Sequence, residues 1–173
     1  MEFYQKLNAL CIEILSTPLP EGKIKIAICG ACGSGKSTLG GRIRKQGFGD
    51  FKPYQIAVID DNVMSLNLFI ARPKIKFPPP PQRIDNCKPF FKFLPFYVKL
   101  VFCIGASANR LDFADILILV QVSQETRQKR LTQREKDPQR IQSLLNASIN
   151  PNLRYNHKML ISLEESFEPK LLE

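Results

Sequence analysis

Residues Ile24–Thr38 read I-K-I-A-I-C-G-A-C-G-S-G-K-S-T, and the prediction of the fold starts from these residues. Its second part matches G-x-x-x-x-G-K-[ST], the phosphate-binding loop motif. The apolar run Ile24–Cys29 has the length of a buried strand, and a helix is predicted to start near Lys36. A chance glycine turn is the alternative, but strand, loop and helix in this order are the context that makes the motif specific. The stretch therefore predicts binding of a nucleoside triphosphate.

Each part of the loop has a physical role in that prediction. Gly30, Gly33 and Gly35 let the backbone wrap closely, so that several amide N–H groups point at a polyphosphate. Lys36 brings a mobile cation to the terminal phosphates, and Ser37 offers a hydroxyl to the accompanying Mg²⁺. The predicted nucleotide-binding residues are Gly30, Ala31, Cys32, Gly33, Ser34, Gly35, Lys36, Ser37 and Thr38.

Length and composition favour one well-buried domain over residues 1–173. The chain is 44% hydrophobic and 24% charged, which is ordinary for a globular protein. Its longest apolar run, Ile116–Val122, has strand length, so no membrane segment is expected. The amino terminus lacks the basic start and apolar core of a secretory signal, so we expect a cytoplasmic protein.

Charge and cysteine content narrow the classes further. The net charge of +9 serves anionic ligands and leaves contact with nucleic acid open, although no nucleic-acid-binding motif supports it. Five scattered cysteines argue against a disulfide framework. Cys29 and Cys32 form a C-x-x-C pair, but a zinc site needs further ligands, and the one histidine, His157, is predicted to be a solvated loop residue.

Strands alternate with helices along the chain, which predicts an α/β fold of the three-layer P-loop NTPase type. Its mostly parallel central sheet is expected to carry helices on both faces, with ligand at the carboxyl ends of the strands. A fifth parallel strand is not obvious, and 168–172 is a poor candidate. The predicted helices cover 1–17, 36–46, 124–136 and 139–147, and the predicted strands cover 24–29, 54–59, 97–104 and 116–122.

Three segments are expected to decorate this domain: an N-terminal helical segment over 1–20, an insertion over 72–97 and a basic, lid-like helical region over 124–150. The insertion is rich in proline and phenylalanine, so regular secondary structure is not expected around its prolines. It is interpreted as a substrate lid, with Arg83 or Lys88 meeting an anionic acceptor, or as a plain connection. A third interpretation is that Pro78–Pro81 docks on a protein partner.

Three motifs make the chain resemble the P-loop kinases of the uridine kinase and phosphoribulokinase group, which includes pantothenate and glycerate kinases. The first is the phosphate-binding loop. The second is V-I-D-D-N at Val58–Asn62, which resembles the family's strand-end aspartate motif. The third, Leu111–Asp137, is similar to the family's strand followed by an arginine-rich lid helix. The resemblance covers roughly Ile24–Pro138 and implies transfer of phosphate from ATP, with Mg²⁺, to a hydroxyl of a nucleoside, sugar or organic acid.

The resemblance also implies catalytic roles, with Lys36 among the catalytic residues. Asp60 would orient and deprotonate the acceptor hydroxyl, and Asp61 would hold Mg²⁺ through water, whereas the alternative is a capping aspartate. Arg127, Arg130 and Arg134 share a helical face, which is either a lid over the triphosphate or a solvated surface. Arg130 and Arg134 are the lid residues favoured by the resemblance.

Two departures from the family pattern leave a second function open. The family carries an acidic residue before the glycine that ends its third strand, and this chain has Ile104 there. Asn62 and Val63 replace the aromatic residue that follows the aspartate motif. The alternatives are therefore an ATP-binding regulatory protein with little turnover and, from charge alone, a polynucleotide end kinase. A GTPase is disfavoured because no N-K-x-D motif occurs.

Overall fold

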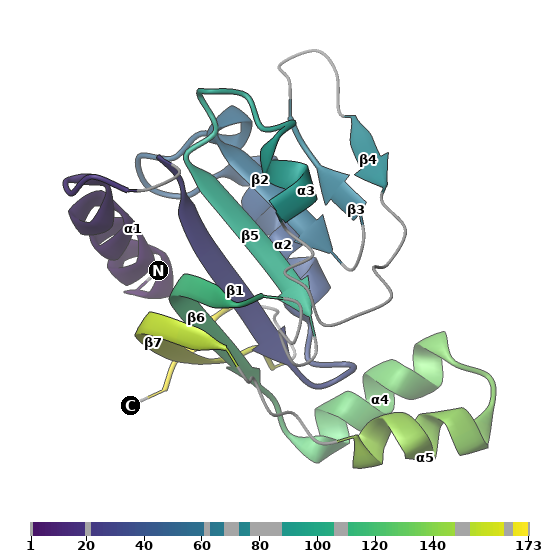
Figure 1. The fold of residues 1–173 in the computed structure, drawn as a ribbon. Helices are drawn as coiled ribbons and strands as arrows, with labels where there is room; N and C mark the ends of the chain where they lie inside the picture. Colours follow the sequence, from purple (N-terminus) through teal and green to yellow (C-terminus); the bar gives the residue numbers. More distant parts are fainter. Residues whose placement is uncertain are drawn as a thin grey trace.

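One eight-stranded sheet organises the protein (Figure 1). The computed structural model describes residues 2–19, 22–60, 63–67, 73–76, 88–105, 111–147, 153–164 and 168–172. The strands are β1 (Ile24–Gly30), β2 (Ile56–Asp60), β3 (Val63–Ser65), β4 (Lys74–Lys76), β5 (Leu100–Gly105), β6 (Phe113–Gln121), β7 (Arg154–Ser162) and β8 (Lys170–Leu171). The helices are α1 (Glu2–Leu15), α2 (Lys36–Gln46), α3 (Lys88–Phe91), α4 (Gln124–Arg134) and α5 (Pro138–Asn146), with a 3₁₀ turn at Pro53–Gln55.

The sheet has the order β4-β3-β2-β5-β1-β6-β7-β8. Its five central strands, from β2 to β7 in that order, are mutually parallel, and the short strands β3, β4 and β8 add antiparallel edges. Almost every residue of β1 is buried, because both faces of a parallel sheet are covered. This arrangement confirms the predicted α/β fold with a mostly parallel central sheet.

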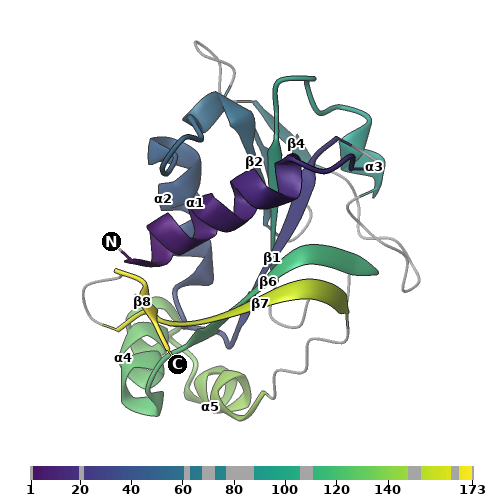
Figure 2. The same cartoon turned by 90° about the vertical axis from the view of Figure 1, so that its left-hand side faces the viewer.

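Helices cover both faces of the sheet, as predicted, but unequally (Figure 2). On one face, α1 and α2 bury Phe3, Leu7 and Ile43 against the isoleucines of β1. On the other face, Phe90 of α3 packs with Cys29 and neighbouring strand residues. Since α3 has four residues, this second outer layer is thin within the described part of the chain.

The local signals predicted most element positions correctly. The helix predicted over 36–46 is α2, and each remaining predicted helix begins and ends within two residues of an observed one. Strand β2 begins two residues later than predicted, because a 3₁₀ turn precedes it. Strand β5 begins three residues later than predicted, because a turn at Pro95 precedes it.

Three predictions about secondary structure were wrong. The fifth parallel strand is β7, which the polar start of Arg154–Ser162 concealed, and His157 therefore lies in a strand rather than in a loop. Residues 168–172 contribute only the two-residue antiparallel strand β8. The insertion contains β4 and α3, although no regular structure was expected around its prolines. Pro78–Pro81 and Arg83 lie outside the described residues.

Candidate functional site

The loop between β1 and α2 depends on its glycines. Gly33 and Gly35 have φ values of +83° and +91°, in the left-handed region that side chains disfavour. A Cβ on Gly33 would also lie 3.2 Å from the carbonyl oxygen of Arg127 in α4. A Cβ on Gly30 would meet the Ser34 Oγ at 2.7 Å and the Val120 carbonyl oxygen at 2.8 Å. The loop is therefore packed tightly between the end of β6 and α4.

The N-terminus of α2 is open at the end of this loop. Gly35 is its N-cap, and no side chain of the described residues caps the helix there. The first turn of α2 carries no acidic residue. Unpaired N–H groups and the positive end of the helix dipole make such a terminus a favourable place for an anion.

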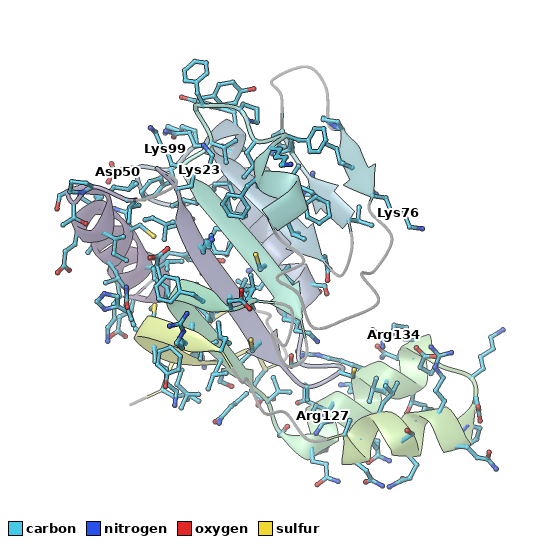
Figure 3. The ribbon with its side chains drawn as sticks, viewed as in Figure 1. Lys23, Asp50, Lys76, Lys99, Arg127 and Arg134 are labelled. Carbon is cyan, nitrogen blue, oxygen red and sulfur yellow. The ribbon has the colours of Figure 1, made fainter. Side chains whose placement is uncertain are left out.

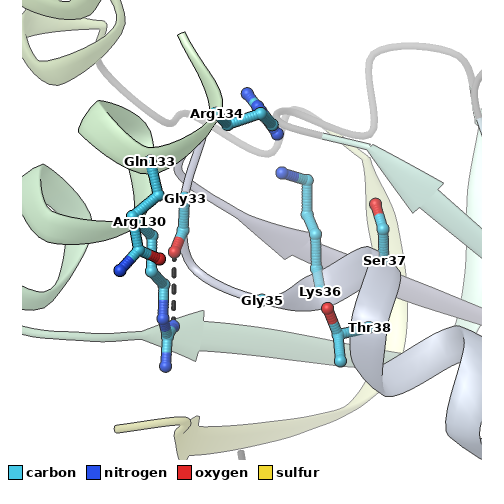
Figure 4. A pocket seen from close by; sticks show the side chains of 8 residues that line it. All are labelled: Gly33, Gly35, Lys36, Ser37, Thr38, Arg130, Gln133 and Arg134. Carbon is cyan, nitrogen blue, oxygen red and sulfur yellow. Dashed lines mark hydrogen bonds between the residues drawn. The ribbon is translucent and has the colours of Figure 1, made fainter. Parts of the chain in front are cut away.

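A cavity of about 370 Å³ lies in front of this helix terminus (Figure 4). The loop and α2 line one side of it, and α4 lines the other. Lys36 is half-buried, and its Nζ donates to the carbonyl oxygen of Ala31 at 3.2 Å. The lining residues are Gly33, Gly35, Lys36, Ser37, Thr38, Arg130, Gln133 and Arg134. Among the described residues, the lining therefore includes three cationic side chains and no acidic side chain.

The three arginines that share a face of α4 have different surroundings. Arg127 and Arg130 are half-buried and donate to the backbone carbonyl oxygens of Cys32 and Gly33, both at 3.3 Å. Burial lowers the pKa of Arg130 from its ordinary value. The side chain of Arg134 is 62% exposed and pairs with the adjacent Glu135 at 3.2 Å. Arg134 is thus the exposed arginine of the three, and it lines the cavity.

A carboxylate at the end of β7 anchors the start of α4, and sequence reasoning missed it. Glu164 accepts hydrogen bonds from the Thr126 hydroxyl at 2.6 Å and from the Ser123 backbone N–H at 2.9 Å. These bonds hold the pKa of Glu164 below its ordinary value. Ser123 is the N-cap of α4, and its hydroxyl accepts a hydrogen bond from the Thr126 backbone N–H. A serine directly before the predicted helix could have indicated this cap from the sequence. Its pairing with Glu164 could not be predicted in this way, because it joins distant segments.

Asp60, the described aspartate of the V-I-D-D-N motif, does not lie on a strand adjacent to β1. Strand β5 separates β2 from β1, and Asp60 pairs with Ile104, which in turn pairs with Ile28. With strands about 4.8 Å apart, Asp60 lies roughly 10 Å from β1 at the same carboxyl edge of the sheet. Asp61 lies outside the described residues.

Strand β5, which lies between β2 and β1, ends in Ile104 and Gly105 and carries no acid there. Ile104 of β5 is 6% exposed and packs against α2. A Cβ on Gly40 would lie 2.2 Å from the Ile104 Cδ1, so this isoleucine occupies the space between strand and helix. Among the described residues, no group of three or more histidine, cysteine, aspartate or glutamate side chains could hold a metal ion.

The residues that line the cavity fit a magnesium ion that arrives bound to a nucleotide, rather than an ion that protein side chains hold by themselves. Mg²⁺ keeps several waters and takes its other ligands largely from phosphate oxygens in such sites. Ser37 is exposed and lines the cavity, so its hydroxyl can serve as a protein ligand of that kind.

Comparisons with known proteins do not place the chain in a family. No family model matches the sequence, and no curated protein does so either. One crystal structure, of a "putative fructose transport system kinase" from Silicibacter sp. TM1040, has 16% sequence identity and a TM-score of 0.44, over 85% of this chain and 97% of that one. No described helix is long and apolar enough to cross a membrane.

Proposed function

We propose that this protein binds a magnesium-bound nucleoside triphosphate, ATP first of all, at Gly30–Thr38 and transfers its γ-phosphate to a hydroxyl of a small molecule. The supporting observation is the cavity of about 370 Å³ that is lined by the N-terminus of α2, by Lys36 and by two arginines of α4, Arg130 and Arg134. Phosphoryl transfer needs mainly positioning and neutralisation of charge, and this cavity concentrates positive charge around the open helix terminus.

The residues of the chain divide the work in this proposal. The loop amides and the start of α2 hold the β-phosphate, and Lys36 exchanges its neutral carbonyl partner for a phosphate oxygen, which is a stronger acceptor. Arg134 approaches the terminal phosphate from α4. Magnesium, held through Ser37 and Asp61, supplies further neutralisation when bound. Asp60, at the carboxyl end of β2, accepts the proton of the acceptor hydroxyl.

A second function is favoured by one specific observation. Ile104 fills the place at the end of β5, directly beside β1, where the related kinases carry an acid. A protein that binds ATP there as a regulatory ligand needs the loop but not that acid. Binding of nucleotide is common to both functions, and turnover separates them.

ATP consumption measured against a panel of nucleosides, sugars and hydroxy acids distinguishes the two. For a kinase we expect one acceptor to stimulate turnover, and we expect Asp60→Asn to reduce the stimulated rate by about 10²- to 10⁴-fold. Asp112 directly precedes β6 and so lies at the amino ends of the parallel strands, away from Asp60. Asp112→Asn is therefore the matched control and should retain the rate. Lys36→Ala should abolish nucleotide binding in calorimetry.

The other outcomes of these measurements would each contradict the small-molecule kinase function. Slow hydrolysis that ignores every acceptor and survives Asp60→Asn would establish the regulatory function. Phosphorylation of a 5′-hydroxyl oligonucleotide alone would establish an end kinase. An absence of heat with both Mg-ATP and Mg-GTP would contradict nucleotide binding itself.

A further inference from the structure

Arg127 near the start of α4 joins two segments that are distant in the sequence (Figure 3). Its Nε donates to the Cys32 carbonyl oxygen of the phosphate-binding loop at 3.3 Å. One terminal nitrogen, Nη2, donates to the carbonyl oxygens of Leu144 and Leu145 in α5, at 3.0 Å and 3.2 Å. A single guanidinium thus connects the loop to the last turn of α5.

Helix α5 needs a cation at this end because its own sequence supplies none. Its last turn contains no basic residue, and its C-cap, Ala147, has φ −62° and ψ 117° rather than the left-handed conformation of a glycine cap. The last carbonyl groups of a helix lack partners within it and carry the negative end of the dipole. Arg127 provides both hydrogen bonds and positive charge there.

The loop, in turn, has successive carbonyl groups held from α4. Arg127 holds Cys32, and Arg130 holds Gly33, while the missing Cβ of Gly33 allows α4 to approach this closely. A loop that binds an anion turns its N–H groups towards it and its carbonyl groups elsewhere. Arginines that hold the carbonyl groups therefore favour the conformation that binds phosphate.

We propose that Arg127 is a positioning residue that couples the phosphate-binding loop to α5, so that nucleotide in the loop orders α5 and loss of Arg127 weakens nucleotide binding. This inference rests on the proposed nucleotide binding. Helix α5 does not line the cavity, so a response of α5 to nucleotide would have to pass through α4 and its arginines. Arg127 differs from Arg134 in this respect, since Arg134 lines the cavity itself.

The test combines calorimetry with amide hydrogen exchange on the full chain, using Mg-ATP as the probe. Wild type, Arg127→Gln, Arg127→Lys and Arg140→Gln are compared. Arg140 is the matched control because it lies on α5, is 66% exposed and pairs with Glu135 rather than with the loop. Circular dichroism melting shows whether each variant is folded.

In the wild type, Mg-ATP should slow exchange of the amides of α5 by about tenfold, and Arg140→Gln should behave in the same way. Arg127→Gln should raise the dissociation constant for Mg-ATP by about tenfold, because one charged hydrogen bond to the loop is lost. It should also abolish the effect of Mg-ATP on α5. Arg127→Lys keeps the charge but not the planar fork, so it should fall between the two.

Two results would overturn the inference while leaving nucleotide binding intact. One is wild-type protein that binds Mg-ATP with no change in α5 exchange, a result that needs no variant to fold. The other is faster α5 exchange in Arg127→Gln with unchanged affinity for Mg-ATP, which would mean that Arg127 only stabilises α5 against α4. Wild-type protein that does not bind Mg-ATP would refute the proposed function, and this inference with it.

Discussion

Two adjacent glycines in α2 should respond in opposite ways to alanine. A Cβ on Gly41 would have no heavy atom within 4 Å, whereas a Cβ on Gly40 would lie 2.2 Å from the Cδ1 of Ile104. Both substitutions gain the same helix propensity, since glycine is less favourable than alanine by about 1 kcal/mol inside a helix. The difference between them therefore measures how closely α2 packs on β5.

The expected sizes follow from the space at each position. Gly41→Ala should raise the free energy of unfolding by about 0.5–1 kcal/mol. Gly40→Ala should lower it by about 1 kcal/mol, because overpacking a closed core costs about 1–3 kcal/mol and helix propensity offsets part of this. Ile104 is 6% exposed, and Val58 lies on the same side of the contact, so the isoleucine has little room to move away.

A third variant tests the cause. Ile104→Val removes the Cδ1 atom and should cost about 0.5–1.5 kcal/mol by itself. Combined with Gly40→Ala, it should cost at least 1 kcal/mol less than the sum of the single changes, because the clash is gone. Urea unfolding, fitted with a shared m-value, gives the free energy of unfolding of the wild type, the three single variants and the double variant. If Gly40→Ala proved as stabilising as Gly41→Ala, Ile104 would not fill the space between β5 and α2.

Two further predictions concern ionisable groups. The hydrogen bonds from Thr126 and Ser123 lower the pKa of Glu164 from the ordinary 4.5, so its contribution to stability should be complete above that value and fall away as the pH drops through the lower, folded-state pKa. Urea unfolding between about pH 3 and pH 6 should show this loss in wild type and a flatter profile in Glu164→Gln. Burial raises the pKa of Cys11 and Cys29 to about 12, so an alkylating reagent at about pH 8 should spare both in the folded protein. Cys32 is partly exposed and should react, with protection by Mg-ATP; mass spectrometry that found Cys29 modified as fast as Cys32 would contradict the described burial.

The sequence alone was sufficient wherever the signal is local. The apolar run before Gly30, the glycine spacing and Lys36 predicted a strand, a tight loop and a helix, because each depends on neighbouring residues and on backbone conformations that only glycine adopts readily. The helix over 124–136 followed from its spacing in the same way. The two-sided burial of the parallel strands was readable from continuous apolar runs.

The tertiary structure alone decided which of these elements meet. Strand β5 lies between β2 and β1, so Asp60 is separated from the strand that precedes the loop. Ile104 of β5, rather than Asp60, is on the strand adjacent to β1. The strand β7 has a polar, exposed start and is recognised only by its pairing with β6. The sequence left two interpretations for the helical face that carries Arg127, a lid or a solvated surface. The contacts of Arg127 with Cys32 and α5 distinguish it from the exposed Arg134. Strand order and side-chain partners depend on contacts between residues far apart in the chain, and no local pattern encodes them.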